Sequence, residues 1–107
     1  MNNAKPKIEI DQEILAAFCK KWNIIELSLF GSVLTDDFRP DSDVDVMVTF
    51  AEGVKWTLID LAKMERELGA IYQRNIDLIT RPGVERMENY IRRSSILRGS
   101  SRVYAAG

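Results

Sequence analysis

Histidine is absent from this sequence of 107 residues, and cysteine occurs once, as Cys19. Without histidine there is no Ser-His-Asp or Cys-His catalytic arrangement and no histidine-ligated metal site. A single cysteine excludes an internal disulfide framework and a cysteine-cluster metal site. The chemistry open to the protein therefore comes from carboxylates, hydroxyls, lysine and arginine side chains, and backbone amides.

Long apolar runs are also absent. No stretch reaches the ~20 apolar residues that cross a membrane, and residues 1–7, MNNAKPK, lack the apolar centre of a signal peptide. Together with a free cysteine, this favours a protein of the reducing cytoplasm with no membrane partner. A content of 46% hydrophobic and 29% charged residues is typical of a globular chain. We expect one domain over residues 1–107, with flexible ends at 1–7 and 105–107.

Positive charge is not in excess, since the net charge is −1. Strong binding to a long nucleic acid is therefore not expected. The charge is unevenly distributed: eight acidic and two basic residues lie between Glu26 and Asp60, whereas six arginines and two glutamates follow from Arg81 onward. This distribution suggests a cation site in the middle of the chain and contact with an anion or a partner near its end, although two solvated faces would look the same.

Apolar residues at positions 44, 46, 48 and 50 alternate with Asp43, Asp45, Met47 and Thr49. This period of two predicts a strand over 43–50 with one face on the core and another that begins with two carboxylates. The order of elements predicts an α/β (α+β) fold with a small mixed β-sheet and helices packed mainly on one face. The other expected elements are a helix from Asp11 to Asn23, a strand at Ile24–Phe30, a loop at Thr35–Ser42, a helix from Leu58 to a cap at Gly69, a strand at Ile76–Thr80 closed by Pro82-Gly83, a helix at Val84–Leu97 and an edge strand at Arg102–Ala105.

Asp43 and Asp45 are the first candidates for chemistry. On a strand, residues two apart point to the same face with Cα atoms ~7 Å apart. Their side chains can share divalent ions ~4 Å apart, as in two-metal phosphoryl transfer. Carboxylate oxygens suit Mg²⁺. The alternative is an exposed strand end carrying solubilising acids.

Asp77 is the second candidate, because an unpaired acid within the apolar segment Ile76–Thr80 is costly to bury. If this strand lies beside residues 44–50, Asp77 could join the other two carboxylates on one face. It could then bind metal or take a proton from an attacking hydroxyl. An edge-strand aspartate facing water remains the alternative.

Gly31 and Ser32 directly follow the predicted strand Ile24–Phe30. A glycine there lets the backbone approach a ligand closely. A short helix starting at Ser32 would point free N–H groups at an anion. An ordinary Gly-Ser turn is the alternative. Taken with the three aspartates, however, the pattern suits nucleotidyl transfer from a nucleoside triphosphate.

The segment Gly31–Val48, GSVLTDDFRPDSDVDVMV, resembles the signature of the DNA polymerase beta-like nucleotidyltransferase superfamily, and the short chain resembles its minimal nucleotidyltransferase (MNT) domains. The resemblance implies a polymerase beta-like fold. It implies that Gly31 and Ser32 bind the triphosphate, and that Asp43, Asp45 and Asp77 are the catalytic carboxylates, which bind two Mg²⁺ ions.

Small domains of this type are often antitoxins paired with a HEPN-type ribonuclease toxin. The resemblance therefore implies transfer of AMP from ATP to a tyrosine hydroxyl of a toxin, as in a type VII toxin–antitoxin pair. Many relatives carry arginine after Gly-Ser, where this chain has Val33 and Leu34. Arg39 or the C-terminal arginines could replace it. Two alternatives stay open: an inactive antitoxin that neutralises its partner by binding, and a transferase acting on a small molecule such as an antibiotic.

Overall fold

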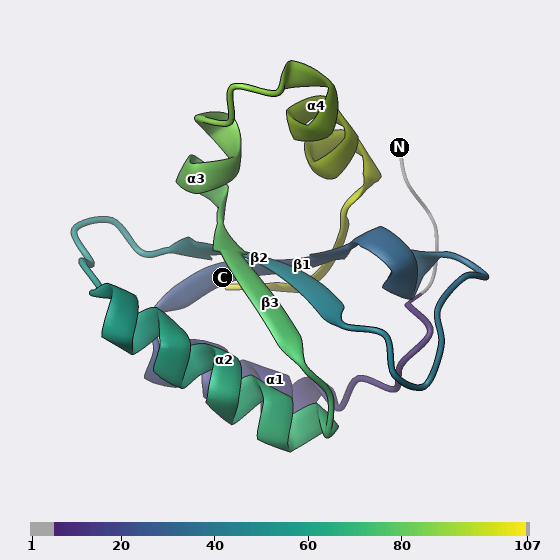
Figure 1. The fold of residues 1–107 in the computed structure, drawn as a ribbon. Helices are drawn as coiled ribbons and strands as arrows, with labels where there is room; N and C mark the ends of the chain where they lie inside the picture. The colour runs from purple at the N-terminus through teal and green to yellow at the C-terminus, as the bar shows by residue number, and fades with distance from the viewer. Residues whose placement is uncertain (1–5, 107) are drawn as a thin grey trace.

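The computed structural model describes residues 6–106, which fold around a four-stranded mixed sheet in the order β3-β2-β1-β4 (Figure 1). β1 pairs antiparallel with β2 and β4, and β2 pairs parallel with β3. This agrees with the expected α/β class and mixed sheet. Along the chain the elements are α1 (Gln12–Lys21), β1 (Ile24–Phe30), the 3₁₀ turn η1 (Gly31–Leu34), β2 (Val44–Phe50), α2 (Leu58–Tyr72), β3 (Ile76–Thr80), α3 (Arg81–Glu85), α4 (Tyr90–Gly99) and β4 (Ser101–Ala105).

The main core lies between the sheet and the helices α1 and α2. Val44, Val46 and Val48 of β2 are at most 1% exposed there, so the alternating pattern correctly predicted a buried face. They pack with Leu15 of α1 and Leu68 of α2. The carboxylate of Asp11 starts α1 by accepting hydrogen bonds from backbone amides two and three residues on, at 3.0 and 3.1 Å.

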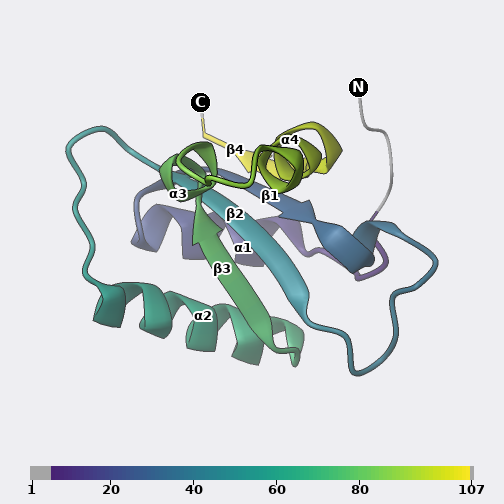
Figure 2. The ribbon, with the colours of Figure 1, turned by 45° about the horizontal axis from the view of Figure 1, so that its top comes forward.

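Helices cover both faces of the sheet. The two longer ones, α1 and α2, share one face as expected, while α3 and α4 lie over the other (Figures 1 and 2). A smaller cluster of Phe30, Met47, Val84 and Ile96 fixes this second layer. Residues on the second face of β2 thus lie under α3 and α4, and this layer builds the walls around the candidate site.

Two of the predicted helices differ from those in the structure. The helix expected at 84–97 is split: α3 includes Pro82 at its start and ends at Glu85, and Asn89 starts α4 by accepting a hydrogen bond from the Arg92 amide at 3.1 Å. Gly69 does not end α2, which continues to Tyr72 and is capped by Gln73 in a left-handed conformation. A β-carbon at Gly69 would lie 2.8 Å from the Arg74 carbonyl oxygen, so packing rather than capping requires this glycine.

Parts of the chain ends are ordered by hydrogen bonds. The Lys7 amide donates to the Val33 carbonyl at 2.8 Å, and the Ala106 amide donates to Ile25 at 2.8 Å. The expectation of flexible ends stays a prediction, and residues 1–5 and 107 lie outside the described part. Between residues 6 and 106, none of the helices is both long and apolar enough to cross a membrane.

Candidate active site

The chain leaves β1 beside the first carboxylate of β2. Phe30 pairs with Asp45 in the antiparallel ladder, and Gly31 follows immediately. Gly31 has a φ of +80°, in the left-handed region that favours glycine. A β-carbon on Gly31 would collide with Oδ2 of Asp45, so the bare backbone of the turn lies directly against the carboxylate. The close approach predicted for this glycine is thus made, in this structure, to a side chain of the site itself.

Asp45 and Asp77 lie side by side on neighbouring parallel strands. They are partners in the register of β2 and β3, so their side chains project to the same face of the sheet. Asp45 is partly buried and Asp77 is exposed. β3 is an edge strand of the sheet, and Glu65 of α2 accepts a hydrogen bond from the Leu78 amide of β3 at 2.8 Å. The expected adjacency of the two aspartates is present.

The electrostatics of Asp45 reflect this grouping. Burial raises the pKa of the Asp45 carboxyl, and the neighbouring charges of Asp77 and Asp43 raise this pKa further. The positive charge of Arg92 acts in the opposite direction on the same pKa. Like charges gathered at one point are unfavourable without a cation to neutralise them. The arrangement is therefore suited to attract positive charge.

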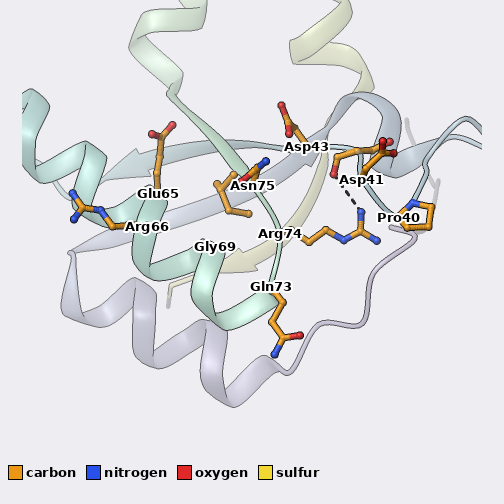
Figure 3. Close-up of a pocket in the computed structure, with 11 residues that line it drawn as sticks. Pro40, Asp41, Asp43, Glu65, Arg66, Gly69, Gln73, Arg74 and Asn75 are labelled. Atoms are coloured by element: carbon orange, nitrogen blue, oxygen red, sulfur yellow. Dashed lines mark hydrogen bonds between the residues drawn. The ribbon is translucent and has the colours of Figure 1, made fainter.

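Asp43 lies just before β2 and lines a cavity beside α2. This cavity, of about 800 Å³, is bounded by the 40–43 loop, the C-terminal half of α2 and the start of β3. Figure 3 shows the Asp43 carboxylate pointing away from α2, toward the side of the sheet that carries α3 and α4. Its charge still reaches Asp45.

Arg74 holds the loop that precedes Asp43. Its Nη1 donates to the carbonyls of Arg39 at 2.8 Å and Ser42 at 3.2 Å (Figure 3). Its guanidinium carbon lies 4.3 Å from the centre of the Phe38 ring, within cation–π range. The Val44 amide also donates to the Asn75 carbonyl at 2.9 Å. The loop is therefore fastened to the turn before β3 immediately beside the candidate carboxylates.

A second cavity, of about 830 Å³, opens between η1 and α4. Gly31 and Asp45 line one side, and Asn89, Arg92 and Ser95 of the α4 region line the other. Backbone, carboxylate, amide, hydroxyl and guanidinium groups thus surround one space. We call it the α4 cavity. It is large enough for a small-molecule ligand, whose pockets span roughly 300–1,000 Å³.

The predicted site residues are only partly brought together. Asp45 lies against Gly31 and beside Asp77 in register. Ser32 does not line the α4 cavity, and its carbonyl accepts hydrogen bonds from the Thr35 amide and hydroxyl. In the part of the chain from 6 to 106, no three acidic or cysteine side chains are grouped closely enough to hold a metal ion. Binding of one ion by all three aspartates would therefore require their side chains to move closer together.

The donor chemistry nevertheless fits magnesium. Carboxylate oxygens are the ligands it prefers, and two carboxylates suffice where water and phosphate supply the remaining positions. The pKa of the Asp45 carboxyl is raised first by burial and then by the charges of Asp77 and Asp43. Asp43 and Asp45 are the residues that would hold the ion, with Asp77 next to them in register.

Two residues of this region were not singled out from the sequence. Arg92 was noted only as one of the C-terminal arginines, because nothing local shows that α4 folds back over the sheet. Arg74 carried no signal, since its partners are backbone carbonyls more than thirty positions away. For Arg92, the only signal in the sequence was the excess of arginine from residue 81 onward.

The glycine turn after β1 lies against Asp45, and Asp45 stands beside Asp77 on a mixed sheet. The nucleotidyltransferase domain model matches residues 11–100, so this chain belongs to the nucleotidyltransferase domain family. A protein of Methanocaldococcus jannaschii, provisionally named a protein adenylyltransferase, is 31% identical over 72 residues, which are 67% of this chain and 74% of that protein. The chain is accordingly a nucleotidyltransferase by family.

Solved structures show the same fold. A provisionally named minimal nucleotidyltransferase is 27% identical, with a TM-score of 0.65, covering 86% of this chain and 88% of the other. A toxin–antitoxin complex with AMP-PNP gives a TM-score of 0.69 at 12% identity, covering 91% and 75%. A tri-AMPylated HEPN toxin of Shewanella oneidensis in complex with its MNT antitoxin gives 0.61 at 12% identity, covering 89% and 70%. The last two support the fold alone.

Proposed function

We propose that this protein is a Mg²⁺-dependent nucleotidyltransferase that moves AMP from ATP to a hydroxyl group of a protein partner. The observation that carries the proposal is the position of Asp45, which lies against Gly31, stands beside Asp77 in the β2–β3 register and lines the α4 cavity. Gly31 and Ser32 bind the triphosphate through the turn that they form. Asp43, Asp45 and Asp77 are the catalytic carboxylates.

The proposed reaction forms one bond and breaks one. The acceptor hydroxyl oxygen attacks the α-phosphate of ATP, the bond between the α- and β-phosphates breaks, and pyrophosphate leaves. Asp77 is exposed and stands beside Asp45, so its carboxylate can reach the acceptor and take the hydroxyl proton. Asp45 lies against the turn at Gly31, beside the groups that would bind the phosphates.

Mg²⁺ bound by Asp43 and Asp45 would supply neutralisation of the charge that develops on the phosphates. The protein itself contributes by holding the carboxylates in position. Arg74 fixes the loop before Asp43, and the β-ladder fixes Asp45 opposite Phe30. Holding the reacting groups in place is a large part of catalysis in phosphoryl transfer.

The proposed partner is a HEPN-type toxin, which makes the protein the antitoxin of a cytoplasmic toxin–antitoxin pair. Support comes from the relative named as a protein adenylyltransferase and from the fold shared with an MNT antitoxin bound to an AMPylated HEPN toxin. An exposed apolar pair, Tyr90 at 65% and Ile91 at 68%, lies at the start of α4 beside the cavity. It offers a contact surface at the place where an acceptor must approach.

Label transfer tests this proposal. The purified protein is incubated with Mg²⁺, ATP labelled in the α-phosphate and an extract of the native host, and labelled proteins are separated by size. The expected result is a labelled band with the wild type and none with Asp45→Asn. Asp37→Asn is the matched control, because Asp37 is an exposed aspartate of the preceding loop that lines neither cavity.

A binding-only antitoxin is the second candidate. It is favoured by the apolar residues Val33 and Leu34 after Gly-Ser and by the absence of a three-carboxylate group within residues 6–106. The double variant Asp43→Asn/Asp45→Asn separates the two functions. If this variant still neutralises the toxin, binding is sufficient; if it binds the toxin without neutralising it, transfer is required.

A further inference from the structure

The α4 cavity contains a single cationic side chain. Among the described residues that line it, Arg92 is the only lysine or arginine, and it faces Gly31 and Asp45 across the space. The turn that would meet the triphosphate, from Gly31 to Leu34, has no basic residue. A triphosphate is strongly anionic, and its neighbours here include partly buried Asp45. A site of this composition needs positive charge from a residue outside the turn.

The other arginines near the sheet have different partners. Arg81 and Arg102 both form ion pairs with Glu26, at 3.7 and 3.3 Å. Arg93 donates to the Met87 carbonyl at 2.7 Å. These contacts use the guanidinium groups within the fold and away from the cavity.

Arg39, the other arginine that could replace the missing one, also lies elsewhere. Its side chain lines a separate cavity near Lys7, and its carbonyl is held by Arg74. Arg92, by contrast, is exposed, and within residues 6–106 its side chain forms no ion pair. Its guanidinium is therefore available to a ligand.

We propose that Arg92 is the residue that binds the triphosphate chain of the nucleotide in the α4 cavity, in place of a basic residue in the turn after Gly31-Ser32. This inference rests on the proposed function and names a binding residue for it. Arginine suits the role because its planar guanidinium can bind phosphate oxygens through two parallel hydrogen bonds. Asn89 and Ser95, one turn to either side on α4, add polar groups on the same wall.

Equilibrium binding of two probes tests the inference. Calorimetry with AMP-PNP, which carries the phosphates, and with adenosine, which lacks them, is done in Mg²⁺ on the wild type, Arg92→Ala and Arg92→Lys. Arg98→Ala is the matched control, because Arg98 is an exposed arginine of the same helix that does not line the cavity. Circular dichroism checks that each variant is folded, and Arg92→Gln replaces Arg92→Ala if that variant is not.

The expected result is a loss of at least about tenfold in AMP-PNP affinity for Arg92→Ala, partial recovery in Arg92→Lys and no change in Arg98→Ala. Adenosine affinity should be unchanged throughout. Equal AMP-PNP affinity in wild type and Arg92→Ala would overturn the inference, leaving Arg92 as a counter-charge to Asp45. An equal loss for adenosine would also overturn it, since Arg92 would then act through the fold. Failure of the wild type to bind AMP-PNP would instead overturn the proposed function itself.

Discussion

The carboxylate of Asp45 occupies the space that a β-carbon on Gly31 would need. The turn after β1 therefore lies directly against the first carboxylate of β2, and a side chain added at Gly31 would have to displace that carboxylate. This contact explains why a glycine stands at position 31 more directly than turn geometry does. It also provides a way to disturb the candidate site without altering any charged group.

Gly31→Ala should abolish nucleotidyl transfer, because the new methyl group displaces the Asp45 carboxylate. Gly53→Ala is the control: Gly53 has nearly the same φ, +82° against +80°, but nothing within 4 Å of the added β-carbon. Alanine at a positive φ costs about 1–2 kcal/mol, so both variants should lose similar stability in urea unfolding. Transfer that is lost equally in both would mean that strain, and not the contact with Asp45, is responsible.

The sequence predicted β2 well, for a physical reason, whereas its pairing with the Asp77 strand was only a condition that the structure meets. Val44, Val46 and Val48 of β2 are buried on one face of the strand, and burial at every second residue produces a period of two in the sequence. Asp77 stood out because an acid within an apolar strand is costly to bury, and the register places it beside Asp45. Burial accounts for the pattern of β2, but Asp77 is exposed on the edge strand β3, so its place beside Asp45 comes from the strand register and not from the cost of burial.

The rest of the site depends on how distant segments pack. The break between α3 and α4 at Asn89 brings Arg92 over the sheet, and no local pattern encodes that fold-back. Likewise, Arg74 reaches carbonyls in a loop far away in sequence. The sequence could say that arginines were abundant near the end, but only the structure distinguishes Arg92, in the cavity, from Arg102, paired with Glu26.

Arg74→Ala should reduce transfer with little change in global fold. Its guanidinium holds two loop carbonyls just before Asp43, and displacement of that carboxylate by about 1 Å can cost ~100-fold in rate. Arg74→Lys keeps the charge but loses the planar contact with Phe38, and should recover only part of the rate. Arg66→Ala, which removes an exposed arginine from the same cavity, is the control. Full activity in Arg74→Ala would show that the loop needs no such anchor.

Alkaline pH should destabilise the protein through Cys19. Burial raises the pKa of the Cys19 thiol from 9.0 to about 12, so the folded state keeps a proton that the unfolded state releases. This contribution to stability is complete below pH 9.0 and is lost as the pH rises toward about 12, with a slope of at most ~1.4 kcal/mol per pH unit.

Urea unfolding between pH 8 and 11 measures this effect in the wild type and in Cys19→Ala. The variant should show a shallower loss of stability with pH, whatever its stability at neutral pH. The thiol should also react slowly with a thiol reagent in the native protein and rapidly in urea, because Cys19 is 0% exposed. Identical pH slopes in the two proteins would refute a role of Cys19.

Tyr72→Phe should stabilise the protein. Within the described chain, the Tyr72 hydroxyl is buried and has no hydrogen-bond partner, and burial is the main cause that raises the pKa of this phenol. An unsatisfied buried polar group costs about 1–3 kcal/mol, so its removal should raise the free energy of unfolding by roughly 1 kcal/mol. Tyr90→Phe is the control, because Tyr90 is 65% exposed and its hydroxyl is open to water. The prediction is refuted if Tyr72→Phe is less stable than the wild type in urea unfolding while Tyr90→Phe is unchanged. That result would mean that the Tyr72 hydroxyl has a hydrogen-bond partner in solution.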